Sequence, residues 1–98
     1  MNDENHEYPS KEMKELYEAV LKLKNPEEVS NFFRDLLTIA EIKEFANRFQ
    51  AAKLLEQGMP YAEIAKKLKI STTTVTRVAL WLNHGMGGYK LILKRLSK

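Results

Sequence analysis

The sequence contains no cysteine and no long apolar run, and these two absences exclude several kinds of protein. Without cysteine there is no disulfide, no thiolate zinc site and no cysteine nucleophile. No apolar run approaches the ~20 residues that a membrane-spanning helix needs. The acidic, polar start MNDENHEYP is unlike a secretory signal or a basic transit peptide. We therefore expect a cytoplasmic protein with no membrane partner.

Histidine is scarce as well, and its placement argues against an enzyme. His6 falls in a polar N-terminal stretch and His84 in a glycine-rich helix break, and neither has a carboxylate at a fixed helical spacing. No cluster of Asp, Glu and His suits a metal ion, and no glycine-rich loop follows a strand. We expect no catalytic residue, no metal site and no cofactor.

Helical periodicity is abundant throughout the chain. Six successive segments repeat apolar positions at i, i+3 and i+4, and capping residues, prolines or glycines separate them. The predicted fold is all-α, with a mobile tail over residues 1–9 and one helical domain over residues 10–98. Apolar faces on six helices exceed what a chain of 98 residues can bury alone. This excess predicts a homodimer formed by helix exchange.

Capping signals place the boundaries of the first three helices. Ser10 begins one helix and Asn25-Pro26 the next, while the capping box from Thr38 to Glu41 begins a third. The third helix is expected to have about 19 residues and to end at Gly58. The predicted apolar faces are Met13, Leu16, Tyr17, Val20 and Leu21; Val29, Phe32, Phe33, Leu36 and Leu37; and Ile42, Phe45, Ala46, Phe49, Ala52 and Leu55.

The stretch from Pro60 to Leu82, PYAEIAKKLKISTTTVTRVALWL, predicts a helix-turn-helix over about residues 60–83. Its apolar sets are Ile64, Ala65, Leu68 and Ile70 in the first helix and turn, and Val75, Val78, Ala79 and Leu82 in the second helix. The threonine run after the cap Ser71 is β-branched and a poor helix former. A strand is nevertheless excluded, because the apolar positions follow a helical period and both flanks are helical.

The polar face of this helix-turn-helix is basic and rich in hydroxyl groups, as in proteins that read DNA in the major groove. Residues 36–98 carry a net charge of +7, against −4 for residues 1–35, and such a basic surface attracts phosphates. The predicted contacts to double-stranded DNA are Lys66, Lys67, Lys69, Ser71, Thr72, Thr73, Thr76 and Arg77. The simpler alternatives are an unevenly charged solvated surface and a Ser/Thr-rich cap that only begins a helix.

Three other features belong to the second half of the chain. Arg48 lies on the flank of the third helix, where the alternative to a functional role is an exposed pairing with Glu44. Trp81 flanks the predicted buried face and is expected in the core or in an interface. The segment from His84 to Gly88 breaks the helix as a hinge, and a final short helix carries Tyr89, Ile92, Leu93 and Leu96.

Over LLTIAEIKEFANRFQAAKLLEQGMPYAEIAKKLKISTTTVTRV the sequence resembles the Trp repressor family, in particular the small Trp-repressor-related proteins of the YerC/YecD type. The shared features are Leu-Leu-Thr before the third helix, an arginine ten residues after Thr38, and Thr-x-x-Arg in the second helix of the motif. The resemblance implies an intertwined, all-helical homodimer that binds operator DNA as a sequence-specific transcription regulator of the repressor type. It also implies a corepressor pocket beside the reading helix.

Carried over residue by residue, the resemblance implies an effector pocket at Thr38, Arg48, Thr74 and Arg77, which match positions that bind L-tryptophan in the repressor. Val78 stands where the repressor has glycine, so its branched side chain should fill the indole slot. This substitution argues against tryptophan and leaves the corepressor, a small molecule, unidentified.

A second departure concerns the turn, where Lys69 replaces another glycine of the repressor. Lysine costs ~1 kcal/mol there if the turn needs a positive φ. The acidic N-terminal helices and the altered pocket also leave an alternative function open. In that alternative, the chain is a helical protein-interaction or assembly module that keeps the fold without reading an operator.

Overall fold

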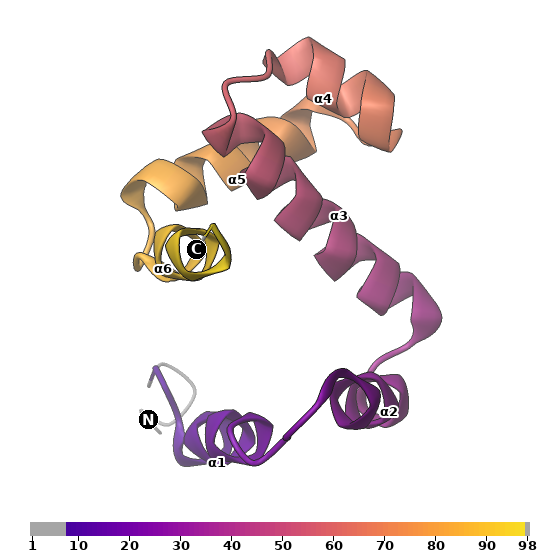
Figure 1. Cartoon of the computed structure of the whole chain (residues 1–98), viewed down its shortest axis with the longest axis vertical. Helices are drawn as coiled ribbons and strands as arrows, with labels where there is room; N and C mark the ends of the chain where they lie inside the picture. Colours follow the sequence, from indigo (N-terminus) through magenta and orange to yellow (C-terminus); the bar gives the residue numbers. More distant parts are fainter. Residues whose placement is uncertain (1–7, 98) are drawn as a thin grey trace, which may run out of the picture. The chain divides into compact units, whose positions relative to one another are not determined.

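The computed structural model describes residues 8–97, and its regular structure is entirely helical (Figure 1). Six helices span this range: α1 (Lys11–Val20), α2 (Pro26–Leu36), α3 (Ile39–Glu56), α4 (Tyr61–Leu68), α5 (Thr72–His84) and α6 (Gly88–Leu96). The predicted all-α fold is confirmed. Apart from Tyr8 and Pro9, the predicted mobile tail lies outside the described residues. Among the described helices, none has the length and apolar character needed to cross a bilayer.

The chain divides into two compact units, which meet in sequence between Thr38 and Ile39. The N-terminal unit contains α1 and α2, and the C-terminal unit contains α3 to α6. The helix-turn-helix predicted at about residues 60–83 corresponds to α4, the turn and α5, all within the C-terminal unit. A single domain over residues 10–98 stays a prediction.

The side-chain caps expected at three helix starts are present. Ser10, Asn25 and Ser71 each accept a hydrogen bond from the backbone N–H three residues later, at 3.2, 2.9 and 3.1 Å. These bonds satisfy N–H groups that the first turn of a helix leaves without an intrahelical partner. α3 begins directly after Thr38, as predicted, and has 18 residues.

Two helix ends use left-handed backbone. Gly58, with φ of 89°, follows α3 as predicted. Lys69 ends α4 with φ of 58° and ψ of 45°, and it is the only non-glycine residue with positive φ between residues 8 and 97. In this conformation the Cβ of an L-residue crowds the following carbonyl oxygen, which costs ~1–2 kcal/mol. Lys69 therefore adopts the left-handed conformation considered from the sequence, in which lysine is less stable than glycine.

The core of the C-terminal unit lies where α3, α4 and α5 pack together. Its buried side chains are Ala51, Ala52, Leu54, Ile64, Ala65, Val75, Val78, Ala79 and Leu82. The apolar set predicted for α5 is buried throughout. In the first helix of the motif and its turn, Ile64 and Ala65 are buried, while Leu68 and Ile70 pack partly buried against the core. Both apolar sets of the helix-turn-helix are thus confirmed.

The apolar face predicted for α3 is partly wrong. Ala51 and Leu54 are buried although they lie off that face, whereas Phe45, which lies on it, is 47% exposed. α3 carries apolar side chains on more than one side, and all of its buried residues fall in its C-terminal half. Periodicity identifies residues that share a face, but it does not say which face the chain itself covers.

The helices of the N-terminal unit bury none of their residues. On α1 the predicted apolar face is exposed at every position, from 37% at Leu16 and Val20 to 82% at Leu21. On α2, Val29 and Leu36 are exposed as well, and the two phenylalanines are half-buried. The predicted faces exist as continuous apolar surfaces, and nothing within their own unit covers them fully.

The left-handed turn at Lys69 yields a test of stability. Lys69→Gly should raise the free energy of unfolding by ~0.5–1 kcal/mol, because glycine adopts positive φ without the Cβ clash. Lys66→Gly provides the matched control. Lys66 is exposed within α4, where glycine should lower stability by ~1 kcal/mol. Urea unfolding at equal protein concentration measures both; losses of similar size in the two variants would contradict the strained turn.

Candidate nucleic-acid interface and adjoining cavity

The eight residues predicted to contact DNA are all exposed, on α4, on the turn and on the first two turns of α5. They are Lys66, Lys67, Lys69, Ser71, Thr72, Thr73, Thr76 and Arg77. The core packing explains this exposure on α5, since Val75, Val78, Ala79 and Leu82 occupy its opposite side. The structure therefore presents the predicted set together on the helix-turn-helix surface.

The electrostatics of this surface favour anions. No acidic residue follows Glu63 in the sequence, and the first turn of α5 contains none. The partial positive charge at the start of α5 is therefore not offset by a carboxylate on its own helix. Backbone N–H groups at such a helix start, together with nearby lysines, form a suitable site for phosphate oxygens.

The hydroxyl groups at the start of α5 are partly used within the helix. Ser71 Oγ caps the helix and lies 3.0 Å from Thr74 Oγ1. Thr76 Oγ1 donates to the carbonyl oxygen of Thr72 at 2.9 Å. For Thr72 and Thr73, neither side chain forms a hydrogen bond within the described chain. The threonines are therefore not equivalent as donors toward an external partner.

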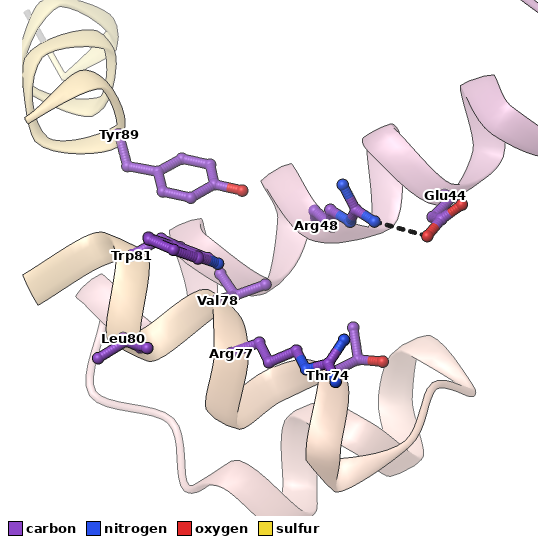
Figure 2. A pocket seen from close by; sticks show the side chains of 8 residues that line it. All are labelled: Glu44, Arg48, Thr74, Arg77, Val78, Leu80, Trp81 and Tyr89. Carbon is purple, nitrogen blue, oxygen red and sulfur yellow. Dashed lines mark hydrogen bonds and ion pairs between the residues drawn. The ribbon is translucent and has the colours of Figure 1, made fainter. Parts of the chain in front are cut away.

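A cavity of about 470 Å³ lies along α5, between its buried side and its exposed side (Figure 2). Its lining comes from α3, α5 and α6: Glu44, Arg48, Thr74, Arg77, Val78, Leu80, Trp81 and Tyr89. Four of the five residues predicted for an effector pocket thus surround one space. The fifth, Thr38, belongs to the N-terminal unit and is not among the lining residues.

The lining of the cavity from α5 is bulky. Val78 is 2% exposed, so its branched side chain is packed into the core side of the cavity. Trp81 lines the cavity and is 58% exposed, so of its two predicted positions the core is excluded within this chain, and an interface stays a prediction. Figure 2 shows Tyr89 facing this group from α6, with its hydroxyl directed toward Arg48.

The charges around the cavity are two guanidinium groups and one carboxylate. Arg48 Nη2 lies 2.6 Å from Glu44 Oε2, and its guanidinium carbon lies 5.7 Å from the centroid of the Phe45 ring. The pairing with Glu44 expected as the simpler alternative is therefore present, in a residue that also lines the cavity. Because both side chains are half exposed, the pair contributes only ~0.3–0.5 kcal/mol to stability.

Tyr89 responds to both burial and charge. Burial raises the pKa of the Tyr89 hydroxyl above 10.0, and the nearby positive charge of Arg48 offsets part of that shift. The hydroxyl therefore stays protonated at neutral pH and can donate a hydrogen bond into the cavity. The cavity combines a neutral phenol with a net positive charge, which suits a small anion better than a cation.

Sequence reasoning missed four cavity residues: Glu44, Leu80, Trp81 and Tyr89. A signal was available for Trp81, because positions 74, 77, 78 and 81 follow i, i+3, i+4, i+7 spacing and so share one side of α5. Tyr89 had no such signal, since the fold of the glycine break decides where α6 returns. Among residues 8–97, no group of three or more His, Asp or Glu could hold a metal ion.

Comparison with known proteins places the chain in a family. The family model described as Trp repressor protein matches residues 11–97. The uncharacterized protein YerC of Bacillus subtilis (strain 168) is 39% identical over 88 residues, which cover 90% of this chain and 85% of YerC.

Solved structures agree with this assignment. The crystal structure of a TrpR-like protein from Eubacterium eligens is 38% identical, with a TM-score of 0.87 over 91% of this chain and 92% of that one. A Staphylococcus aureus protein, provisionally assigned as a Trp repressor, is also 38% identical, with a TM-score of 0.86 over 99% of this chain and 95% of that one. The chain belongs to the Trp repressor family.

Proposed function

We propose that this protein is a homodimeric transcription regulator that binds specific double-stranded DNA through its helix-turn-helix. One observation carries the proposal. The eight predicted contact residues on α4, the turn and the start of α5 are all exposed, and each has a positively charged side chain or a hydroxyl group. Membership of the Trp repressor family supports it.

In the proposed complex the first two turns of α5 enter the major groove, as the second helix of such motifs does. Thr72, Thr73, Thr76 and Arg77 then face base edges and the adjacent backbone. Lys66, Lys67 and Lys69 lie on the preceding helix and turn, where they would contact phosphates. Phosphate contacts provide affinity and orientation, whereas the side chains of α5 provide the discrimination between sequences.

The exposed apolar faces support a dimer. α1 and α2 have no buried residue, and α6 leaves Leu91, Ile92 and Leu96 between 41 and 59% exposed. A second copy that packs on these faces would bury them, at ~25 cal/mol per Å² of apolar surface. A two-fold dimer would hold two reading helices about one DNA turn apart, roughly 34 Å.

The cavity offers a route to control by a small molecule. Arg77 belongs both to the predicted DNA contacts and to the cavity lining, so a ligand that engages its guanidinium would change what α5 presents to DNA. Two arginines and the Tyr89 hydroxyl favour an anionic ligand. Val78 stands where the repressor has glycine and lines the cavity, which disfavours L-tryptophan as that ligand.

Selection of bound duplexes from a random pool tests the proposed function. The expected result is a two-fold symmetric consensus with half-site centres about 10 base pairs apart. Enrichment of asymmetric sites would contradict the dimer. Absence of enrichment at low salt, together with a co-purifying protein partner, would favour the alternative of an interaction module.

The lysines of α4 should set the salt dependence of binding. Replacing Lys66 and Lys67 together by alanine removes two predicted phosphate contacts from each protomer, four from the dimer, so the slope of log K against log salt should fall by ~3.6 on any duplex that both protomers contact. Fluorescence anisotropy across a salt series measures the slope. Lys43→Ala is the control, because Lys43 is exposed on α3 away from the reading surface; an equal change in that variant would show a general charge effect.

The apolar face of α1 should be required for dimerisation. Leu16→Glu places a charge on that face in both copies, and loss of two buried leucines should raise the dimer dissociation constant at least ~100-fold. Sedimentation velocity would then show a monomer. Lys14→Glu puts the same side chain on the polar face of α1 and should leave the dimer intact. Equal sedimentation of the two variants would argue that α1 lies outside the interface.

L-Tryptophan should not act as the corepressor. Adding millimolar tryptophan should change the affinity for the selected duplex by less than about twofold, because the ligand cannot favour the DNA-bound form without a site that accepts it. Isothermal titration of tryptophan into the free protein should correspondingly release no binding heat. A tryptophan-dependent consensus would show that Val78 does not close the indole slot.

A further inference from the structure

The threonines at the start of α5 differ in what they offer to a partner. Thr72, Thr73 and Thr76 are exposed, while Thr74 is half-buried beside the cap. Four threonines lower the intrinsic stability of a helix start relative to straight-chain residues. Core packing does not require exposed β-branched residues there. What distinguishes these threonines is the hydroxyl and methyl groups that they expose to a partner.

Thr76 has its hydroxyl turned back onto its own helix. Oγ1 donates to the carbonyl oxygen of Thr72 at 2.9 Å, a bond that threonine forms readily inside helices. A threonine Cβ carries one hydroxyl and one methyl group. With the hydroxyl bonded to the preceding turn, the methyl is the group that the exposed Thr76 side chain offers outward.

A methyl group has one specific counterpart on base edges in the major groove. Thymine alone among the four DNA bases carries a C5-methyl, which makes apolar contacts with side chains such as the methyl of threonine. Guanine is read by Arg or Lys, adenine by Asn or Gln, and cytosine by Asp or Glu. Thr76 has none of those side-chain groups, and its hydroxyl proton is already donated to Thr72, so the methyl remains as the group that fits thymine.

We propose that Thr76 is a specificity-determining residue that reads thymine through its methyl group and donates no hydrogen bond to a base. The proposal rests on the proposed DNA-binding function. It assigns each half-site one thymine position at which loss of the C5-methyl weakens binding. The hydroxyl of Thr76 serves the helix and fixes the direction of the methyl.

Two conservative substitutions, of which only Thr76→Val is isosteric, separate the groups of Thr76. Thr76→Val keeps a methyl and removes the hydroxyl, whereas Thr76→Ser keeps the hydroxyl and removes the methyl. On the duplex selected by the wild-type protein, Thr76→Val should bind within about twofold of wild type. Thr76→Ser should bind about 15-fold more weakly, the value of two buried methyls, one in each half-site. Thermal unfolding of each variant checks that the exposed substitution leaves the fold intact.

The complementary experiment changes the DNA. Deoxyuridine is placed at each thymidine of the half-site in turn, which removes only the C5-methyl. At one position the wild-type protein should lose about fourfold in affinity. Thr76→Ser should show no further loss at that position, because two groups in contact give non-additive losses.

The outcomes distinguish this inference from the function on which it rests. Absence of any enriched duplex for the wild-type protein would overturn both. Enrichment with a loss in Thr76→Val as large as that in Thr76→Ser would overturn the methyl assignment alone, since the hydroxyl would then be the reading group. Additive losses from Thr76→Ser and every uridine substitution would also overturn it, because Thr76 would then touch no thymine methyl.

Discussion

The reading surface depends on the packing of α4 and α5 against two small residues of α3. Ile64 and Val75 are fully buried, as are Ala51 and Ala52, and all four belong to one core cluster. Alanines at the crossing let helix axes approach closely, since the interaxial distance depends on the side chains at the contact. This packing fixes the rotation of α5 about its own axis and therefore decides which of its side chains face outward.

α5 contributes residues to three surfaces, because helical spacing places different residues on different sides of the helix. Val75, Val78, Ala79 and Leu82 form the core side, and Thr72, Thr73 and Thr76 form the exposed side. The positions 74, 77, 78 and 81 line the cavity between these sides. Arg77 is shared by the cavity and the predicted DNA contacts. A ligand in the cavity could therefore act on the proposed DNA contacts directly through Arg77, without coupling through other residues.

Local signals predicted most of the fold, and the failures share one cause. The caps Ser10, Asn25 and Ser71 and the turn glycine Gly58 were predictable from neighbouring residues alone. Each cap accepts a hydrogen bond from an N–H group three residues later, and Gly58 supplies a positive φ just after its helix. The buried face of α3 was not predictable, because it depends on which apolar faces the chain covers itself. The cavity shows the same division: Thr74, Arg77 and Val78 share one side of α5 by helical spacing, whereas Tyr89 reaches the cavity only through the tertiary placement of α6.

Departures from local preference gather between Lys69 and Thr76. Lysine occupies a left-handed position that glycine would fill without a Cβ clash, and a run of β-branched residues follows the cap of α5 where straight-chain residues would be more stable. Elsewhere in the described chain, α1 and α2 begin with Ser and Asn caps, and the other positive φ values belong to glycines. A protein that breaks local rules in one short stretch, while its core there is well packed, retains those residues for what they present. That stretch is the surface where Lys69 adds charge and Thr76 adds a methyl.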